Sequence, residues 1–231
     1  MGIYGAAIPG TLGTMKPKNK SVTDKSANRK PVVKRPAKAL ANEVRIIGGQ
    51  WKRTKLPVAN KPGLRPTPDR VRETLFNWLG QDLTGWRCLD AFAGTGALGF
   101  EAASRGATDV QVVEHDAVLV AQLKTIQTRL EASAVNVQRG DGVATLKHAS
   151  PASLDLVFLD PPFDGGLFDS ALQAAGRAVK PGGFVYLEAP TAWADEALQP
   201  FGLKSLRHLK AGAVHAHLLA PLSAPSDSGT A

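Results

Sequence analysis

The 231-residue sequence has a single cysteine, Cys88, so an internal disulfide is excluded. Cys88 stands in an apolar run, where we expect a reduced thiol inside the core. The chain has no apolar run close to the ~18 residues that span a bilayer, and its first residues lack the apolar centre of a secretory signal. These absences predict a cytoplasmic protein. A transit peptide stays open, because residues 1–23 contain no acid, although they are rich in Lys rather than Arg.

Acidic residues are scarce at the front of the chain. Residues 1–44 hold nine Lys/Arg against two acids, and residues 45–72 hold eight against one. Residues 73–231 hold eleven Lys/Arg against seventeen acids, within a total net charge of +8. An acidic body with a basic front is the pattern of a protein that binds a polyanion. For residues 1–40 alone, a solvated tail is the favoured reading.

Composition divides the chain into four parts. Residues 1–43 are rich in Lys, Pro, Ala and Ser, and we expect a disordered basic tail. Residues 44–66 predict a short β-hairpin extension that turns at Gly48-Gly49. Residues 67–222 form the main domain, and residues 223–231 predict a flexible tail.

The main domain opens with a helix in "RPTPDRVRETLFNWLG". Thr67 is expected at the N-cap, Pro68 in the first turn and Gly80 just past the end. Its predicted apolar stripe consists of Val71, Leu75, Trp78 and Leu79.

After Gly85 the pattern alternates between strands and helices. Strands are expected near 87–92, 109–114, 134–139, 154–159 and 183–188. Helices are expected near 96–105, 116–132, 142–148, 166–179 and 191–199. The end, "LKSLRHLKAGAVHAHLLA", reads as an antiparallel hairpin around Gly212. The sequence therefore predicts an α/β fold: a mostly parallel, seven-stranded twisted sheet covered by helices on both faces.

A glycine-rich loop follows the first of these strands, in "CLDAFAGTGALGFEAA". Gly94, Gly96 and Gly99 have the spacing of a nucleotide-binding turn, and Glu114 follows Gly94 by twenty residues. An acid at that place binds ribose hydroxyls, so a nucleoside crevice is favoured over a purely structural turn. Asp90, at the end of the first strand, would repel a pyrophosphate but suits a cationic ligand.

Asp-x-x-x-Gly-x-Gly resembles motif I of class I S-adenosylmethionine-dependent methyltransferases. The resemblance implies that Asp90, Gly94 and Gly96 line the methionine end and that Glu114 holds the ribose. Asp141, in "RGDG", matches the place near the adenine, although it is equally suited to cap the following helix. The implied S-adenosylmethionine site comprises Asp90, Ala91, Gly94, Thr95, Gly96, Glu114, His115, Asp141 and Gly142.

The stretch "LVFLDPPF" places Asp160 where the fourth strand of the main domain ends, next to the first. Asp160 and the carbonyl of Pro161 provide two acceptors for the two N–H groups of an exocyclic amine. Pro161 and Pro162 fix φ, and Phe163 offers a face for a base. The alternative is a rigid exit turn. The stretch resembles the (D/N)-PP-(F/Y/W) signature of methyltransferases that modify amino groups of adenine, cytosine or guanine. Whether Asp160 also accepts a proton stays open.

With "VRIIGGQWKRTKLPV", "LDAFAGTGALGFEAASRGA", "VVEHD" and "FLDPPF" in this order, the chain resembles the RsmD family over about residues 44 to 220. The resemblance implies a Rossmann-like class I methyltransferase that methylates N2 of one guanine in 16S rRNA of the small subunit. We expect a monomer that binds the small ribosomal subunit or its assembly intermediate. It also implies that Thr67 and Pro68 lie near the methionine carboxylate. Alternatives are an adenine-N6 methyltransferase of DNA or RNA, a nicotinamide-dependent oxidoreductase and a non-catalytic RNA-binding factor.

The basic front provides candidate RNA contacts. Cations suit phosphates, and an indole ring stacks on bases. The candidates are Arg45, Trp51, Lys52, Arg53, Arg65 and Arg70. The five histidines lack metal-ligand spacing with the cysteine, so we expect no metal, and His215 and His217 alternate on one strand as structural residues would.

Overall fold

The computed structural model describes residues 43–61, 64, 66–163 and 165–222. Most of the expected basic tail, the expected C-terminal tail and the RNA-contact candidate Arg65 lie outside the described residues. Within the described part, no helix is long and apolar enough to cross a membrane.

Nine strands and six α-helices make up the described part of the chain. The front and the first βα units are β1 (Glu43–Arg45), β2 (Lys55–Pro57), α1 (Asp69–Trp78), β3 (Arg87–Asp90), α2 (Ala97–Ser104), β4 (Asp109–Glu114) and α3 (Ala117–Arg129). The remainder is β5 (Val135–Arg139), α4 (Gly142–His148), β6 (Leu154–Leu159), α5 (Phe168–Ala178), β7 (Val179–Ala189), α6 (Asp195–Leu198), the 3₁₀ turn η1 (Gln199–Phe201), β8 (Leu203–Ala211) and β9 (Val214–Pro221).

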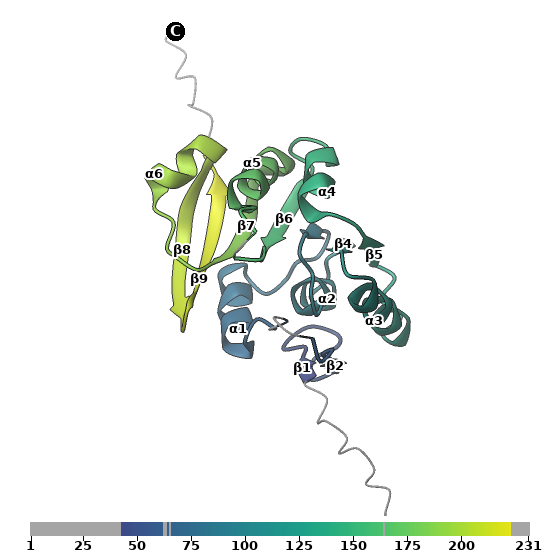
Figure 1. Ribbon diagram of the computed structural model, residues 1–231. Helices are drawn as coiled ribbons and strands as arrows, with labels where there is room; N and C mark the ends of the chain where they lie inside the picture. The colour runs from purple at the N-terminus through teal and green to yellow at the C-terminus, as the bar shows by residue number, and fades with distance from the viewer. Residues whose placement is uncertain (1–42, 62–63, 65, 164, 223–231) are drawn as a thin grey trace, which may run out of the picture. The chain divides into compact units, whose positions relative to one another are not determined.

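The main sheet has seven strands in the order β5-β4-β3-β6-β7-β9-β8 (Figure 1). Strands β3 to β7 pair in parallel, whereas β9 is antiparallel to both β7 and β8. The predicted mostly parallel seven-stranded sheet with a terminal hairpin is therefore confirmed. Because β3 and β6 are neighbours in the sheet, the chain leaves β3 toward β4 on one side and returns to β6 on the other, which creates a switch in strand order.

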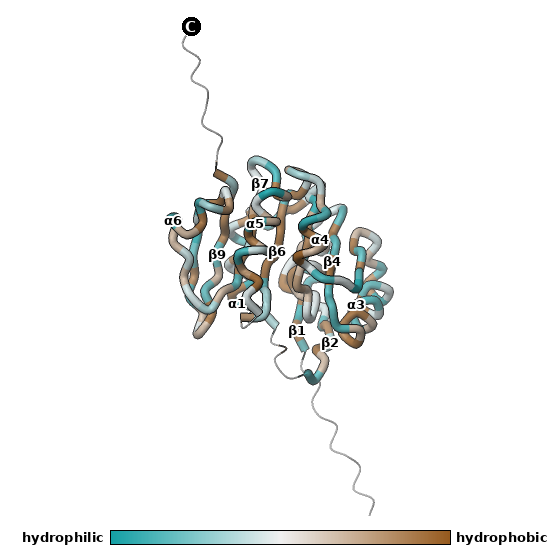
Figure 2. The backbone as a smooth tube through the Cα atoms, turned by 45° about the horizontal axis from the view of Figure 1, so that its top comes forward, coloured by the Kyte–Doolittle hydropathy of each residue, from teal (hydrophilic) through white to brown (hydrophobic). Residues whose placement is uncertain are grey.

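Two apolar clusters cover the two faces of the sheet. One joins α1, α2 and α3 to β3–β7 and β9 through residues such as Leu75, Phe100 and Phe158. The other joins α4, α5 and α6 to the opposite face through residues such as Leu159 and Leu187. Figure 2 shows hydrophobic residues along the central strands and hydrophilic residues on the outer turns of α3. All six residues of β6 are buried, as a central parallel strand requires.

The front hairpin differs from the prediction in its turn. Strands β1 and β2 pair at Val44↔Leu56, but residues 46–54 join them rather than a tight turn at Gly48-Gly49. The reason is a contact with α2: a Cβ on Gly49, whose φ is +70°, would lie 1.7 Å from the Ser104 carbonyl oxygen. These glycines therefore serve the close approach of this linking segment to α2.

Helix α1 also corrects two predictions. Pro68 precedes the first helical residue, and the Thr67 hydroxyl donates to Glu188 at 2.7 Å, so Thr67 is not the N-cap. The buried face of the helix is Val71, Arg72, Leu75 and Phe76, so it includes a fully buried charged residue that the predicted stripe lacked, and Trp78 of that stripe is only half-buried. The predicted end is confirmed, because Gly80 follows the helix with a φ of +88°.

Candidate functional site

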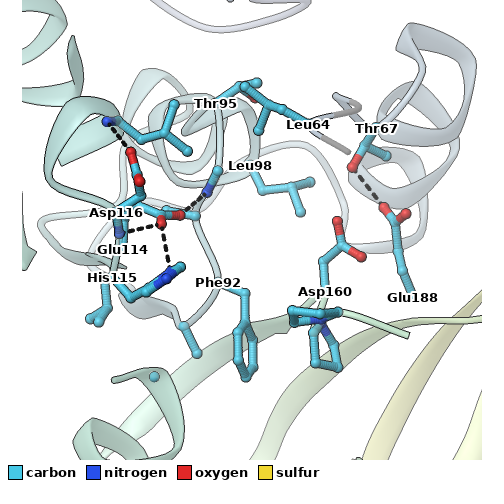
Figure 3. Close-up of a pocket in the computed structure, with 18 of the residues that line it drawn as sticks. Leu64, Thr67, Phe92, Thr95, Leu98, Glu114, His115, Asp116, Asp160 and Glu188 are labelled. Atoms are coloured by element: carbon cyan, nitrogen blue, oxygen red, sulfur yellow. Dashed lines mark hydrogen bonds and ion pairs between the residues drawn. The ribbon is translucent and has the colours of Figure 1, made fainter. Parts of the chain in front are cut away.

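A cavity of about 790 Å³ lies over the carboxyl ends of the parallel strands. The loops after β3, β4, β5 and β6 line it, together with the end of β7 and the segment before α1. Figure 3 shows Glu114 and Asp116 on one side and Asp160 and Glu188 on the other, with Phe92 and Leu98 between. This is the switch in strand order, where open α/β sheets bind their ligands.

The glycine loop after β3 has the backbone that the sequence pattern demands. Gly94 and Gly96 have φ values of +51° and +73°, in the left-handed region that favours glycine. A Cβ on Gly96 would lie 2.4 Å from Leu123 Cδ2. The Gly94 N–H donates to Glu114 Oε2 at 2.9 Å, which fixes the loop against the end of β4.

Asp90 ends β3 beneath the cavity, next to the lining residue Ala91, and it is 3% exposed. Eight of the predicted cofactor residues line the cavity, whereas Asp90, Gly96 and Pro68 lie next to lining residues without lining it themselves. Burial raises its pKa to about 7, and nearby Glu114 and Glu188 add to the rise. Hydrogen bonds from the Gly99 and Phe92 N–H groups act in the opposite direction, and the first of these is 3.0 Å long. This carboxyl group is held in place by backbone donors, yet it forms no ion pair with any residue that the structure describes.

Glu114 is buried at the end of β4, and both of its oxygens accept backbone N–H groups, from Gly94 and Asp116. His115 projects beside it with its side chain 86% exposed. Asp141 accepts from the Ala144 N–H at 2.7 Å and so caps α4. The same residue also lines the cavity, so the expected position near an adenine remains a prediction.

Gly142 explains how α4 reaches this wall of the cavity. A Cβ at this position would lie 1.9 Å from the Ala91 carbonyl oxygen. The loop after β5 can therefore meet the loop after β3 only if residue 142 has no side chain.

Asp160 follows β6 and is half-buried beside the cavity, while Pro161 is buried and Pro162 is exposed. Burial raises the pKa of Asp160 well above its ordinary value, and the charges of Glu188 and Asp90 raise it further. Phe163 lies at the rim, 41% exposed, with its ring centroid 6.2 Å from that of Phe168. The structure thus brings the glycine loop and the predicted catalytic segment into one cavity.

Glu188 is a cavity residue that the sequence analysis missed. It is 5% exposed near the end of β7, one position past the pair Leu159↔Leu187, and therefore lies beside Asp160. Its Oε1 accepts from the hydroxyls of Thr67 and Tyr186 at 2.7 and 2.9 Å. Burial raises the pKa of Glu188, while these two hydrogen bonds oppose the rise. The signal was available, because an acid at the carboxyl end of a parallel strand faces the ligand edge of the sheet.

Negative charge in the lining of the cavity and directly beneath it is uncompensated. Asp90, Asp160 and Glu188 form no ion pair with any of the residues that the structure describes. Buried carboxylates without a partner are unfavourable, and a bound cation relieves them. The residues present therefore fit a ligand that combines positive charge with a nucleoside, as S-adenosylmethionine does.

A buried ionic network ties the front of the chain to α2. Glu101 accepts from Arg72 at 3.2 Å and from Arg105 at 2.9 Å, and all three side chains are buried. The same carboxylate accepts the N–H groups of Ile47 and Gly48, each at 2.7 Å. Burial lowers the pKa of Arg72, and the charges of Glu101 and Asp69 oppose this effect.

Most of the candidate RNA contacts in the described part are exposed, namely Arg45, Lys52, Arg53 and Arg70. Arg45 pairs with Asp69 at 2.8 Å, and Arg53 has a φ of +70° in the segment that joins β1 to β2. Trp51 is half-buried and packs against the core. Arg72 belongs to the basic front by sequence but points inward, so it adds nothing to the exposed charge.

Three histidines meet on the terminal hairpin, His208, His215 and His217. His208 Nε2 and His215 Nδ1 lie 2.9 Å apart in nearly parallel rings, and His208 stacks on His217 with centroids 4.5 Å apart. Imidazole lone pairs lie in the ring plane, so stacked rings do not direct them at one point. The contact is a hydrogen-bonded and stacked histidine group between β8 and β9.

The sheet order, the glycine loop and the cavity at the switch point are those of class I methyltransferases. A solved structure from Escherichia coli, described as a methyltransferase, aligns with a TM-score of 0.65 at 34% identity and covers 78% of this chain and 98% of that one. The chain belongs to the RsmD family, because the family described as conserved hypothetical protein 95 matches residues 44–220.

Curated relatives agree with this family. Ribosomal RNA small subunit methyltransferase D of Escherichia coli (strain K12) is 44% identical over 141 residues, which are 61% of this chain and 71% of that one. The protein of the same name from Haemophilus influenzae is 44% identical over 151 residues, 63% of this chain and 78% of that one.

Proposed function

We propose that this protein is an rRNA methyltransferase that transfers the methyl group of S-adenosylmethionine to N2 of one guanine in 16S rRNA of the small subunit. The observation that carries the proposal is the position of Asp160 beside the glycine loop in one cavity of an RsmD-family chain. Relatives named for methylation of small-subunit rRNA support the substrate class.

The residues that would hold the cofactor come from four loops. Gly94 and Thr67, which line the cavity, would receive the methionine end, with Asp90 and Gly96 next to the lining of the glycine loop and Pro68 next to Thr67. Glu114 would accept the ribose hydroxyls, and the turn of Asp141 would border the adenine. When bound, S-adenosylmethionine supplies a methyl group that its sulfonium has already activated.

The protein then has to orient the amine. Asp160 and the Pro161 carbonyl accept the two N–H groups of guanine N2, which directs its lone pair at the methyl group. Such placement accounts for ~7–11 kcal/mol of a barrier in well-oriented reactions. Because the pKa of Asp160 is raised, it also accepts the proton that N2 releases more readily than an exposed carboxylate would.

The substrate RNA would meet the front of the protein. Arg45, Lys52, Arg53 and Arg70 are exposed there, and they would contact phosphates. Phe163 lies at the rim of the cavity with an exposed ring, where the target base could stack.

The test uses small subunits from a strain that lacks the modification, with labelled S-adenosylmethionine. We expect label on guanine N2 of 16S rRNA, located by mass spectrometry, and a loss of about 100-fold or more in the Asp160→Ala variant. That variant should still bind the cofactor and RNA. Label on adenine, on cytosine or preferentially on DNA would refute the proposal.

A further inference from the structure

The Asp-Pro-Pro-Phe segment explains why an exocyclic amine is methylated, but it suits adenine, cytosine and guanine alike. Something else in the cavity must select the base. The three bases differ in the ring atom next to the carbon that bears the amine. In guanine this carbon lies between N1, which carries a hydrogen, and N3, which carries a lone pair. In adenine and cytosine its one nitrogen neighbour in the ring, N1 and N3 respectively, carries a lone pair. An acceptor placed beside Asp160 would therefore favour guanine alone.

Glu188 is an acceptor in that place. The ladder between β6 and β7 pairs Leu159 with Leu187, so the next residue of each strand, Asp160 and Glu188, lies on the same face of the sheet. Both residues line the cavity, and Figure 3 shows their carboxylates on the same side of it. Because the two groups are close, the charge of Glu188 adds to the effect of burial in raising the pKa of Asp160.

The orientation of Glu188 is fixed. Its Oε1 takes two hydroxyl donors, from Thr67 and from the fully buried Tyr186. Its Oε2 has no hydrogen-bond donor in the described part of the chain, and it is not sealed from solvent. One oxygen is thus committed to the protein, and the other is available to a ligand in the cavity.

We propose that Glu188 is the residue that selects guanine, with Oε2 accepting the N1–H of the target base while Asp160 and the Pro161 carbonyl accept the N2 hydrogens. This inference rests on the proposed function. An ionised carboxylate only accepts hydrogen bonds, so it would meet the lone pair of adenine N1 or cytosine N3 with repulsion. Burial raises the pKa of Glu188, but the two hydroxyl donors oppose this rise, and the positive charge of a bound cofactor would favour the ionised form further.

A single substitution reverses the preference in this arrangement. In Glu188→Gln, the amide oxygen keeps the hydroxyls of Thr67 and Tyr186, which turns the amide NH₂ toward the cavity. The variant then offers a donor where the wild type offers an acceptor. The matching probe is 2-aminopurine, a base that has the 2-amino group of guanine but a lone pair at N1.

The experiment compares small subunits assembled in vitro on 16S rRNA with guanine or 2-aminopurine at the target position, which mass spectrometry has located. For wild type we expect kcat/KM to be at least about 100-fold lower with 2-aminopurine, because a site built for a hydrogen bond rejects a base that lacks it. In Glu188→Gln, kcat/KM should fall for guanine and rise for 2-aminopurine, so that the ratio moves at least about tenfold toward 2-aminopurine.

Two further variants separate selection from support of the fold. Thr67→Val removes one hydroxyl donor to Glu188 but leaves the Glu188 carboxylate in place. It should therefore lower kcat/KM for both substrates by a similar factor and preserve their ratio. Glu196→Gln makes the same chemical change on the exposed surface of α6 and should leave both rates and the ratio unchanged.

If Glu188→Gln lowered kcat/KM equally for both substrates, so that their ratio did not change, the assignment would be overturned and Glu188 would only position Thr67. Failure of the wild-type protein to methylate guanine N2 at all would instead contradict the proposed function.

Discussion

Replacement of Asp90 by Asn should stabilise the ligand-free protein at pH 8 while it weakens cofactor binding. The pKa of Asp90 is raised from 3.8 to about 7, chiefly by burial. Between these two pH values the folded protein holds a proton that the unfolded chain has released. The contribution of Asp90 to the stability of the wild type is therefore most favourable below pH 4, falls as the pH rises to about 7, and is constant above.

The size of the effect follows from the shift of about 3 pKa units. At about 1.4 kcal/mol per unit, the ionised Asp90 destabilises the folded state by about 4 kcal/mol above pH 7. An Asn side chain has no charge and avoids this destabilisation. It has only one acceptor oxygen for the two N–H groups of Gly99 and Phe92, however, and a buried N–H group without an acceptor lowers the free energy of unfolding by about 1–3 kcal/mol. The net gain is about 1–3 kcal/mol at pH 8 and about zero at pH 5.

Thermal unfolding with and without S-adenosylmethionine measures both effects. At pH 8 we expect Tm of the empty Asp90→Asn variant to rise by roughly 3–10 °C, with a ligand-induced shift much smaller than that of the wild type. Asp109→Asn is the matched control, since Asp109 is exposed on the neighbouring strand and its loss should change stability by less than about 0.5 kcal/mol. A destabilisation of Asp90→Asn that is equal at pH 5 and pH 8 would refute the reasoning.

Three other perturbations test the site and its support. Gly142→Ala forces a Cβ to 1.9 Å from the Ala91 carbonyl oxygen. We expect at least about 2 kcal/mol of destabilisation in denaturant titrations and weaker cofactor binding by calorimetry. Wild-type behaviour of the variant would show that the loops after β3 and β5 need not touch. Arg72→Met removes one of the two cations that pair with the buried Glu101 carboxylate and leaves Arg105 as the other. It should destabilise by about 3 kcal/mol in the same titrations, whereas a neutral effect would mean that the contact is dispensable. Joint replacement of the exposed Lys52 and Arg53 by Gln should weaken RNA binding and leave Tm unchanged. It should also reduce the magnitude of the slope of log K against log[salt] by about 1–2. An unchanged slope would show that neither residue contacts the RNA.

The sequence predicts the sheet and the two loops well, because these depend on local features. Buried runs such as Leu154–Leu159 can only be central strands, and the glycines at 94 and 96 need positive φ. Strand alternation then brings Asp160 and Gly94 to the same edge without knowledge of any side-chain contact.

The features that escaped prediction depend on contacts between residues far apart in the chain. Thr67 is a residue type that is common at N-caps, but its hydroxyl donates to Glu188, which lies 121 residues later in the chain. Arg72 appears to extend the basic front, yet it is buried against Glu101. Glu188 looked like the end of a strand, and its role beside Asp160 becomes visible only once β6 and β7 are paired.

Helix α2 has a consequence beyond packing. Its first residue follows the Gly96 turn at the cavity, and its last residue, Ser104, accepts the Gln50 N–H of the front segment at 2.8 Å. Eight residues at about 1.5 Å each make a rod of about 12 Å. On the proposed function, this rod would set the distance between the exposed cations of the front and the glycine loop at the cavity. An RNA whose phosphates and target base are separated differently would then fail to engage both places at once.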